Sequence, residues 1–131
     1  MSRENVDAVR GLYVALSRGD PGTLDLVHPE AELHQLPNLP GSASYYGREA
    51  FAEAVAAFVA EWEVLRFEPV EVTEADDHVV AHIRAFGRGK ASGVAGAREE
   101  FHAWTMRDGK PHQCFVRSTR AEALEAVELR G

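Results

Sequence analysis

The fold is decided by the stretch Glu100-Phe101-His102-Ala103-Trp104-Thr105-Met106-Arg107-Asp108-Gly109-Lys110. It predicts a β-hairpin with strands over about 98–106 and 110–118, joined by a three-residue turn at 107–109. A three-residue loop that ends in glycine suits a type I turn with a glycine bulge. In this register six side chains share one face of the sheet, in the opposed pairs Glu100 and Val116, His102 and Cys114, and Trp104 and His112.

Upstream of this hairpin, hydrophobic residues recur at helical spacing in two segments. The first helix is expected over 3–18 and the second from residue 47 to about 63, with a short helix at 22–27 and a strand at 30–36 between them. The apolar faces carry Val6, Val9, Leu12, Tyr13 and Leu16 in the first helix, and Phe51, Val55, Phe58, Val59 and Trp62 in the second. Thr119 and Glu122 form a capping box that starts a C-terminal helix.

From residue 64 onward the hydrophobic period changes to two, which is typical of strands. The alternation changes phase at Pro69, so we expect a bulge or an edge position there. A further strand is expected over 78–86, and the glycine-rich segment 87–96 is either a hairpin connection or a bulged continuation of that strand. The prediction is one α+β domain over 1–131, with a curved, mostly antiparallel sheet wrapped around N-terminal helices in a cone with one internal pocket.

Composition narrows the class of protein. The chain has 131 residues and a formal net charge of −7. That charge argues against a nucleic-acid partner and against docking on anionic membranes. Cys114 is the only cysteine, so neither an internal disulfide nor a cysteine zinc site can form. The charged N-terminal residues lack an apolar signal segment, and we therefore expect a cytoplasmic protein.

Four segments of the sequence resemble the SnoaL-like polyketide cyclases of the nuclear transport factor 2-like superfamily, which also contains the steroid Δ-isomerases. They are residues 13–20 (Tyr-Val-Ala-Leu-Ser-Arg-Gly-Asp), the strand Glu32-Leu33-His34, Tyr46-Gly47-Arg48-Glu49, and residues 102–110. The resemblance covers residues 6–129. It implies a deep apolar pocket and a dimer formed through the outer face of the sheet, with activities that range from isomerase, cyclase and lyase to simple ligand binding.

Carrying the isomerase roles over residue by residue gives a poor match. The position of the catalytic aspartate is taken by Gln35, which cannot abstract a proton at neutral pH. The position of the tyrosine that holds the enolate falls at Leu12 or Tyr13, and that of its acidic partner falls nearest His102. The residues therefore do not support the steroid isomerase reaction.

Three residues are the candidate catalytic groups. His102, on the inward face, can donate a proton or a hydrogen bond to a carbonyl oxygen, or simply serve as a hydrogen-bonded pocket histidine. Glu100 shares that face and can orient His102 or act as a base, unless it points into solvent. Tyr13 can offer its hydroxyl to a ligand or act as a core aromatic.

The candidate ligand-binding residues are polar or aromatic side chains near the same face: Gln35, His34, Trp62, Trp104, Phe58 and His112. Gln35 is expected to face the pocket, and strand alternation then turns His34 away unless the strand is bulged. No metal site is predicted. His78 and His82 are four residues apart on a predicted strand, which separates them too far to bind one ion, and the Glu32–His34 pair supplies only two ligands. No cofactor is expected, since the glycines at 87–93 do not fit a nucleotide-binding loop.

The resulting hypothesis is a pocket protein for a small, mostly apolar organic molecule, with cofactor-independent proton transfer as its chemistry. The alternative is a non-catalytic ligand-binding or dimerisation module of the same fold. A homodimer is expected through the outer sheet face, where aromatic and arginine side chains gather at His82, Arg84, Phe86, Phe115 and Arg117.

Overall fold

The computed structural model describes residues 2–18, 22–37, 43–75, 78–91, 93 and 95–130. Within these residues the elements follow the order α1 (Ser2–Arg18), a 3₁₀ helix (Thr23–Leu26), β1 (Glu32–His34), β2 (Ser44–Tyr46), α2 (Arg48–Ala60), β3 (Trp62–Ala75), β4 (His78–Gly89), β5 (Ala95–Arg107), β6 (Lys110–Arg117) and α3 (Arg120–Arg130). The expected α+β class is confirmed. Residues 19–21, a glycine followed by an Asp-Pro pair, lie outside the described residues.

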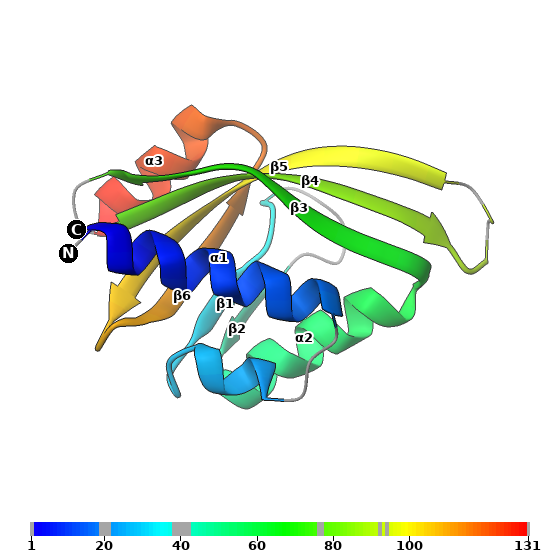
Figure 1. The fold of residues 1–131 in the computed structure, drawn as a ribbon, viewed down its shortest axis with the longest axis horizontal. Helices are drawn as coiled ribbons and strands as arrows, with labels where there is room; N and C mark the ends of the chain where they lie inside the picture. Colours follow the sequence, from blue (N-terminus) through cyan, green and yellow to red (C-terminus); the bar gives the residue numbers. More distant parts are fainter. Residues whose placement is uncertain are drawn as a thin grey trace.

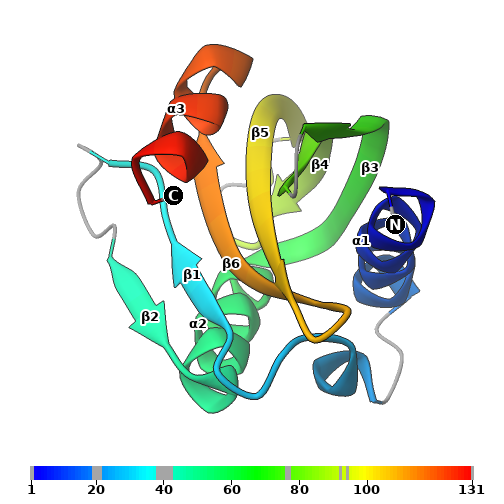
Figure 2. The same cartoon turned by 90° about the vertical axis from the view of Figure 1, so that its left-hand side faces the viewer.

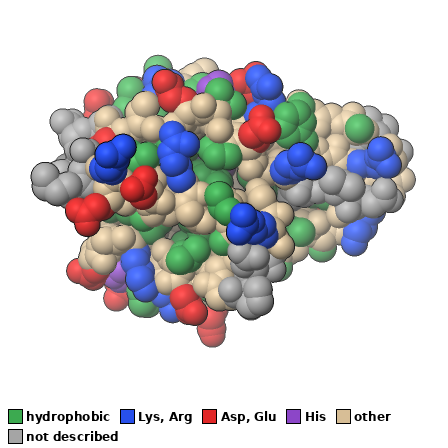
Figure 3. Space-filling view, viewed as in Figure 1, with side chains coloured by type: hydrophobic (Ala, Val, Ile, Leu, Met, Phe, Trp, Pro, Cys, Tyr) green, Lys and Arg blue, Asp and Glu red, His purple; other side chains and the backbone are tan. Residues whose placement is uncertain are grey.

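The described strands form one curved sheet in the order β2-β1-β6-β5-β4-β3, in which β1 and β6 are parallel and the other neighbours are antiparallel. Figures 1 and 2 show the sheet between α1 on its concave side and α3 on its outer side. The far ends of β4 and β5 extend beyond the body as an arm (Figure 1). In Figure 3, Lys and Arg side chains lie along this arm, while acidic and basic side chains mix over the body.

Two apolar clusters hold the layers together. On the concave side, Val9, Leu12 and Tyr13 of α1 are buried against the sheet, as their spacing along the helix predicts. On the outer side, Ala123 and Val127 of α3 pack against buried residues of β4, β5 and β6, namely Val80, Ala103 and Phe115. The Thr119 hydroxyl accepts a hydrogen bond from the Glu122 N–H at 3.1 Å, which confirms the cap that starts α3.

The irregularity expected at Pro69 is confirmed. The register of β3 against β4 shifts between Pro69 and Glu71, and β3 is an edge strand of the sheet. Pro69 lacks an N–H and cannot donate a hydrogen bond to a neighbouring strand. At a bulge on an edge strand this missing donor disrupts the fewest hydrogen bonds of the sheet. The glycine-rich segment continues both strands, since β4 runs to Gly89 and β5 begins at Ala95.

The predicted register of the last hairpin was wrong by two residues. Asp108 and Gly109 both have positive φ, 54° and 76°, and form a two-residue type I′ loop in place of the three-residue turn. A second shift follows at Thr105/Met106, so that Trp104 pairs with Cys114, and His102 with Val116. Two shifts of one residue preserve the alternation, and Glu100, His102 and Trp104 still share the concave face.

Other differences concern element ends. β1 is shorter than expected, and β2 was not predicted. α2 ends at Ala60, because the Glu61 N–H bonds back to the Phe58 carbonyl at 3.2 Å and the Glu61 carbonyl accepts from Lys90 of the neighbouring arm at 3.1 Å. Trp62 is therefore the first residue of β3, paired with Gly89, and not the last apolar residue of the helix.

Candidate functional site

A pocket of about 420 Å³ opens on the concave face of the sheet, and we call it the main pocket. Its walls come from α1, α2 and strands β1, β3, β5 and β6. The lining is mostly apolar, with a polar strip along β5, and comprises Tyr13, Leu16, Leu33, Gln35, Leu36, Phe51, Ala54, Val55, Phe58, Glu61, Phe67, Arg98, Glu100, His102, Trp104, Cys114 and Val116. Its volume lies within the range of small-molecule sites.

Along one wall, five side chains form a continuous hydrogen-bonded row. The Trp104 indole N–H donates to the Tyr13 hydroxyl oxygen at 2.9 Å. That hydroxyl lies 2.6 Å from His102 Nδ1. His102 Nε2 lies 2.8 Å from Glu100 Oε1, and the Arg98 guanidinium donates to the other oxygen of Glu100. Tyr13, Glu100, His102 and Trp104 are all buried.

The donors and acceptors of this row fix its protons. The indole can only donate, so the Tyr13 oxygen accepts and its single proton remains for His102 Nδ1. Nδ1 is then an unprotonated acceptor, and Nε2 carries the ring proton that it donates to Glu100. A neutral His102 in this tautomer gives a partner to the indole N–H, to the Tyr13 hydroxyl and to both of its own ring nitrogens. A carboxylate held by an imidazole and a guanidinium is a charge-assisted arrangement.

The surroundings keep the Glu100 carboxyl ionised and the Tyr13 hydroxyl neutral. Burial alone would raise the pKa of Glu100, but the hydrogen bond and charge of His102, together with Arg98, lower that pKa below its usual value. Glu100 is thus a carboxylate. Burial raises the pKa of the Tyr13 hydroxyl well above its ordinary value, with Cys114 and Glu100 acting in the same direction. Tyr13 therefore stays neutral, as a donor and not as a phenolate.

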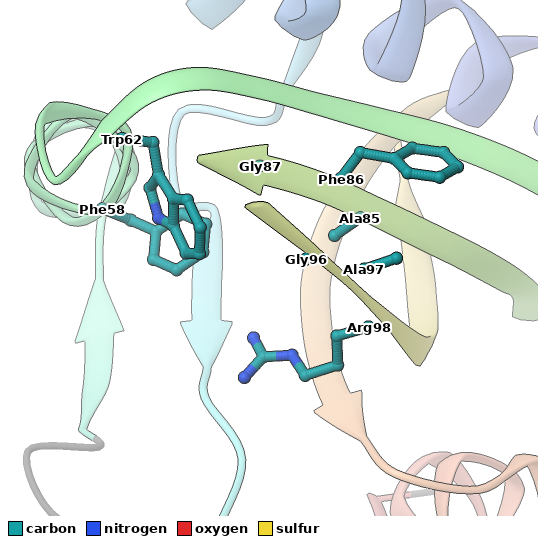
Figure 4. A pocket seen from close by; sticks show the side chains of 8 residues that line it. All are labelled: Phe58, Trp62, Ala85, Phe86, Gly87, Gly96, Ala97 and Arg98. Carbon is teal, nitrogen blue, oxygen red and sulfur yellow. The ribbon is translucent and has the colours of Figure 1, made fainter. Parts of the chain in front are cut away.

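The structure brings most of the predicted site residues to the main pocket. His102, Tyr13 and Glu100 lie in the row, and Trp104 anchors it. Gln35 and Phe58 line the pocket, and the Gln35 side-chain oxygen accepts a hydrogen bond from the Ala43 N–H at 3.1 Å. Trp62 is displaced from this set, because it lines a smaller neighbouring pocket beside Phe58 (Figure 4).

His34 and His112 lie outside the main pocket. His34 stacks on Phe115 with ring centroids 4.7 Å apart, and it bonds to Glu32 at 2.9 Å and to Ser44 at 2.8 Å. Since Phe115 belongs to the outer cluster beneath α3, strand alternation has turned His34 away, leaving Gln35 inward. His112 falls at the register shift of the hairpin and contacts His28, with ring centroids 5.2 Å apart.

Sequence reasoning missed Arg98 and did not include Cys114 among the candidate ligand-binding residues. Alternation along β5 places Arg98 on the same face as Glu100, and this signal was available. Cys114 lines the pocket wall, and burial raises the pKa of its thiol well above the ordinary value, so it stays protonated. Among the described residues, no group of three or more His, Cys, Asp or Glu side chains is placed to hold a metal ion.

Comparison with known proteins identifies the fold and family. A model of the SnoaL-like domain matches residues 9–111. No curated protein is significantly similar in sequence to the chain. Within the described part of the chain, no helix combines the length and the apolar character that a bilayer crossing needs.

Solved structures share the fold, and three of them illustrate the similarity. Bal32a, from a soil-derived mobile gene cassette, is 20% identical with a TM-score of 0.81, over 95% of each chain. TerC, co-crystallised with polyporic acid, is 24% identical with a TM-score of 0.76, over 95% of this chain and 98% of TerC. A protein of ketosteroid isomerase-like fold from Catenulispora acidiphila DSM 44928, in complex with trimethylamine, is 17% identical with a TM-score of 0.74, over 90% and 89%.

Proposed function

Because this chain belongs to the SnoaL-like domain family, we propose that it binds a small, mostly apolar organic molecule in the main pocket and exchanges a proton with an oxygen of that molecule. The reaction class is a cofactor-independent isomerisation, cyclisation or elimination. The observation that carries the proposal is the row that runs from Trp104 to Arg98 and is buried as far as Glu100, because it places a neutral hydroxyl and an imidazole–carboxylate pair on one wall of an otherwise apolar pocket.

In the proposed mechanism, the Tyr13 hydroxyl turns from His102 toward a carbonyl or hydroxyl oxygen of the ligand. The imidazolium form of His102 then supplies the Nδ1–H that the Tyr13 oxygen accepts, while Glu100 stabilises its positive charge. When the carbon next to the carbonyl loses its proton to solvent water, negative charge develops on the ligand oxygen and the Tyr13 proton moves to that oxygen. Tyr13 then regains a proton from His102, and His102 regains one from solvent. The lowered pKa of Glu100 makes it a weak base, so the row delivers protons to oxygen more readily than it removes them from carbon.

The remaining walls bind and orient the ligand. Phe51, Phe58 and Trp104 provide flat apolar surface, and Gln35, directly after β1, provides an amide group. Gln35 occupies the place of the base in the steroid isomerases, and an amide cannot take up a proton there. Solved structures of the fold contain ligands as different as polyporic acid and trimethylamine, which supports a small organic ligand without identifying it.

A second candidate function is ligand binding without turnover. The observation that favours it is the closure of the row, since neutral His102 already has a protein partner on each ring nitrogen. In such a module the row would only position Tyr13 and Trp104.

The two functions separate in one experiment with 1-tetralone, a bicyclic ketone. Binding is followed by tryptophan fluorescence, and turnover by NMR detection of deuterium entering the carbon next to the carbonyl in D₂O. We expect saturable binding and exchange faster than in buffer, with exchange lost in Tyr13→Phe and His102→Gln and kept in Tyr46→Phe, a control at a residue that is 65% exposed. Binding without exchange supports the module, and absence of binding by this and related aryl ketones contradicts both functions.

We further propose a cytoplasmic homodimer that uses the outer sheet face. His82, Arg84 and Phe86 of β4 support this interface, with Phe86 36% exposed. Phe115 does not contribute, because it is buried under α3. Sedimentation at micromolar concentration tests the dimer, and a monomer there would contradict it.

A further inference from the structure

A second, smaller pocket of about 180 Å³ adjoins the main pocket, and we call it the side pocket (Figure 4). Phe58 and Arg98 line both pockets, so the two spaces meet at these side chains. Apart from Arg98, the side pocket is lined by apolar residues and glycines. A cavity of roughly 150 Å³ is enough to hold benzene. The side pocket therefore has room for one aromatic ring.

The side pocket exists because the arm lacks side chains at one rung. Gly87 of β4 pairs with Gly96 of β5 on the concave face. The indole of Trp62 lies against Gly87, where an added Cβ would come within 2.4 Å of ring atom Cε3. Above Gly96 an added Cβ would meet nothing within 4 Å. The glycine pair thus seats an indole on one strand and leaves open space over the other.

Trp62 and Trp104 are held in different ways. Trp104 donates its indole N–H to Tyr13, whereas the Trp62 indole N–H is buried without a hydrogen-bond partner in the described structure. Packing alone therefore positions Trp62, against Gly87 and against Phe58 at a ring-centroid distance of 5.9 Å. A ligand in the side pocket would therefore contact an aromatic ring at this wall, and such a ring packs well against another aromatic ring.

We propose that the side pocket binds the far ring of an elongated, flat aromatic ligand whose oxygen-bearing end lies in the main pocket. The inference rests on the proposed function and names the class of its ligand: fused or linked aromatic rings in a line, with the acceptor oxygen at one end. Because the two pockets meet at Phe58 and Arg98, a single elongated ligand can occupy both of them.

Arg98 has a defined place in this arrangement. One end of its guanidinium is held by Glu100, and its side chain is 54% exposed at the boundary between the pockets. A planar guanidinium stacks on aromatic faces. A ligand that spans the boundary would cover Arg98, whereas a ligand confined to the main pocket would reach only Glu100 and the rest of the row.

The test compares 2-naphthol with 6-phenyl-2-naphthol by isothermal titration calorimetry. In the wild-type protein, the added phenyl ring should tighten binding by about tenfold or more through its apolar burial. Gly87→Ala forces Trp62 off the strand and should reduce this advantage to about threefold or less. Trp62→Leu, which removes the aromatic wall without a clash, should do the same and decides the matter if Gly87→Ala does not fold. Affinity for 2-naphthol should change less than twofold in either variant.

The matched control is Gly11→Ala, on an exposed part of α1 where an added Cβ meets nothing within 4 Å, and it should retain the full advantage of the phenyl ring. If 2-naphthol binds but the phenyl ring adds nothing, or if its advantage survives in both variants, the side pocket is not the subsite and the proposed function stands. If neither naphthol binds, the proposed function falls, and the inference falls with it.

Discussion

Removing one oxygen atom, in Tyr13→Phe, tests the row more directly than any other change. The Tyr13 side chain is 2% exposed, and its oxygen is the shared partner of Trp104 and His102. The phenylalanine ring keeps the shape of the core. It leaves the Trp104 N–H and the His102 Nδ1 lone pair without partners, and both residues are buried.

The magnitude follows from those two orphaned groups. Each buried polar group that loses its partner lowers the free energy of unfolding by about 1–3 kcal/mol. Part of this loss is offset, because the removed hydroxyl no longer has to be desolvated on folding. We therefore expect the free energy of unfolding to fall by about 2–4 kcal/mol. With a urea m-value of about 1–3 kcal/mol/M, the unfolding midpoint should move down by roughly 1 M or more.

The assay is urea unfolding followed by tryptophan fluorescence and by circular dichroism, with Tyr46→Phe as the control. Tyr46 is 65% exposed, so that variant should stay within about 0.5 kcal/mol of the wild type. A double-mutant cycle with Trp104→Phe then isolates the bond between them, because the second substitution removes the orphaned N–H. A Tyr13→Phe protein as stable as the wild type would refute the assignment of donors and acceptors in the row.

Three further outcomes follow from the structure. The lowered pKa of Glu100 means that its stabilising contribution is complete above the ordinary glutamate pKa of about 4.3 and disappears as the pH falls through the lowered value. The difference in unfolding free energy between wild type and Glu100→Gln should therefore be largest near neutral pH and close on acidification, and a gap that is constant from pH 7 to pH 3 would contradict the ion pairing. Burial and the raised pKa of the Cys114 thiol should make its reaction with Ellman's reagent at pH 8 slower by on the order of a hundredfold or more in the native protein than in guanidinium chloride, and equal rates would place the thiol at the surface. Thr119→Ala should cost about 1 kcal/mol by removing the cap of α3, whereas Ser118→Ala next to it should cost little, and equal midpoints for the two variants would show that the cap is dispensable.

Strong periodicity made the architecture predictable. The stripe on α1 and the alternation along β5 are set by burial, and a shift by one residue would expose a whole apolar face. For the same reason Tyr13, Glu100, His102 and Trp104 could be assigned to one space before any coordinates. Gln35 and His34 needed the structure, because a three-residue strand gives too little alternation to exclude a bulge.

The errors came from features that local sequence does not determine. Asp108-Gly109 suits a two-residue I′ loop as well as the end of a three-residue loop, and the shift at Thr105/Met106 depends on pairing across the sheet. The end of α2 was misplaced because Trp62 continues the helical stripe, although pairing with the arm makes it the start of β3. Arg98 was overlooked because its importance comes from Glu100, two residues along the same strand.

The single mobile proton between Tyr13 and His102 links binding to acidity. A ligand oxygen that accepts the Tyr13 hydrogen bond leaves the lone pair of His102 Nδ1 without a donor in a buried wall. In the proposed mechanism a hydrogen ion from solvent binds to that lone pair, and the Glu100 carboxylate already stands on the far side of the ring to balance the added charge. The proposed mechanism therefore predicts that one hydrogen ion is taken up on binding, which calorimetry in buffers of different ionisation enthalpy would detect.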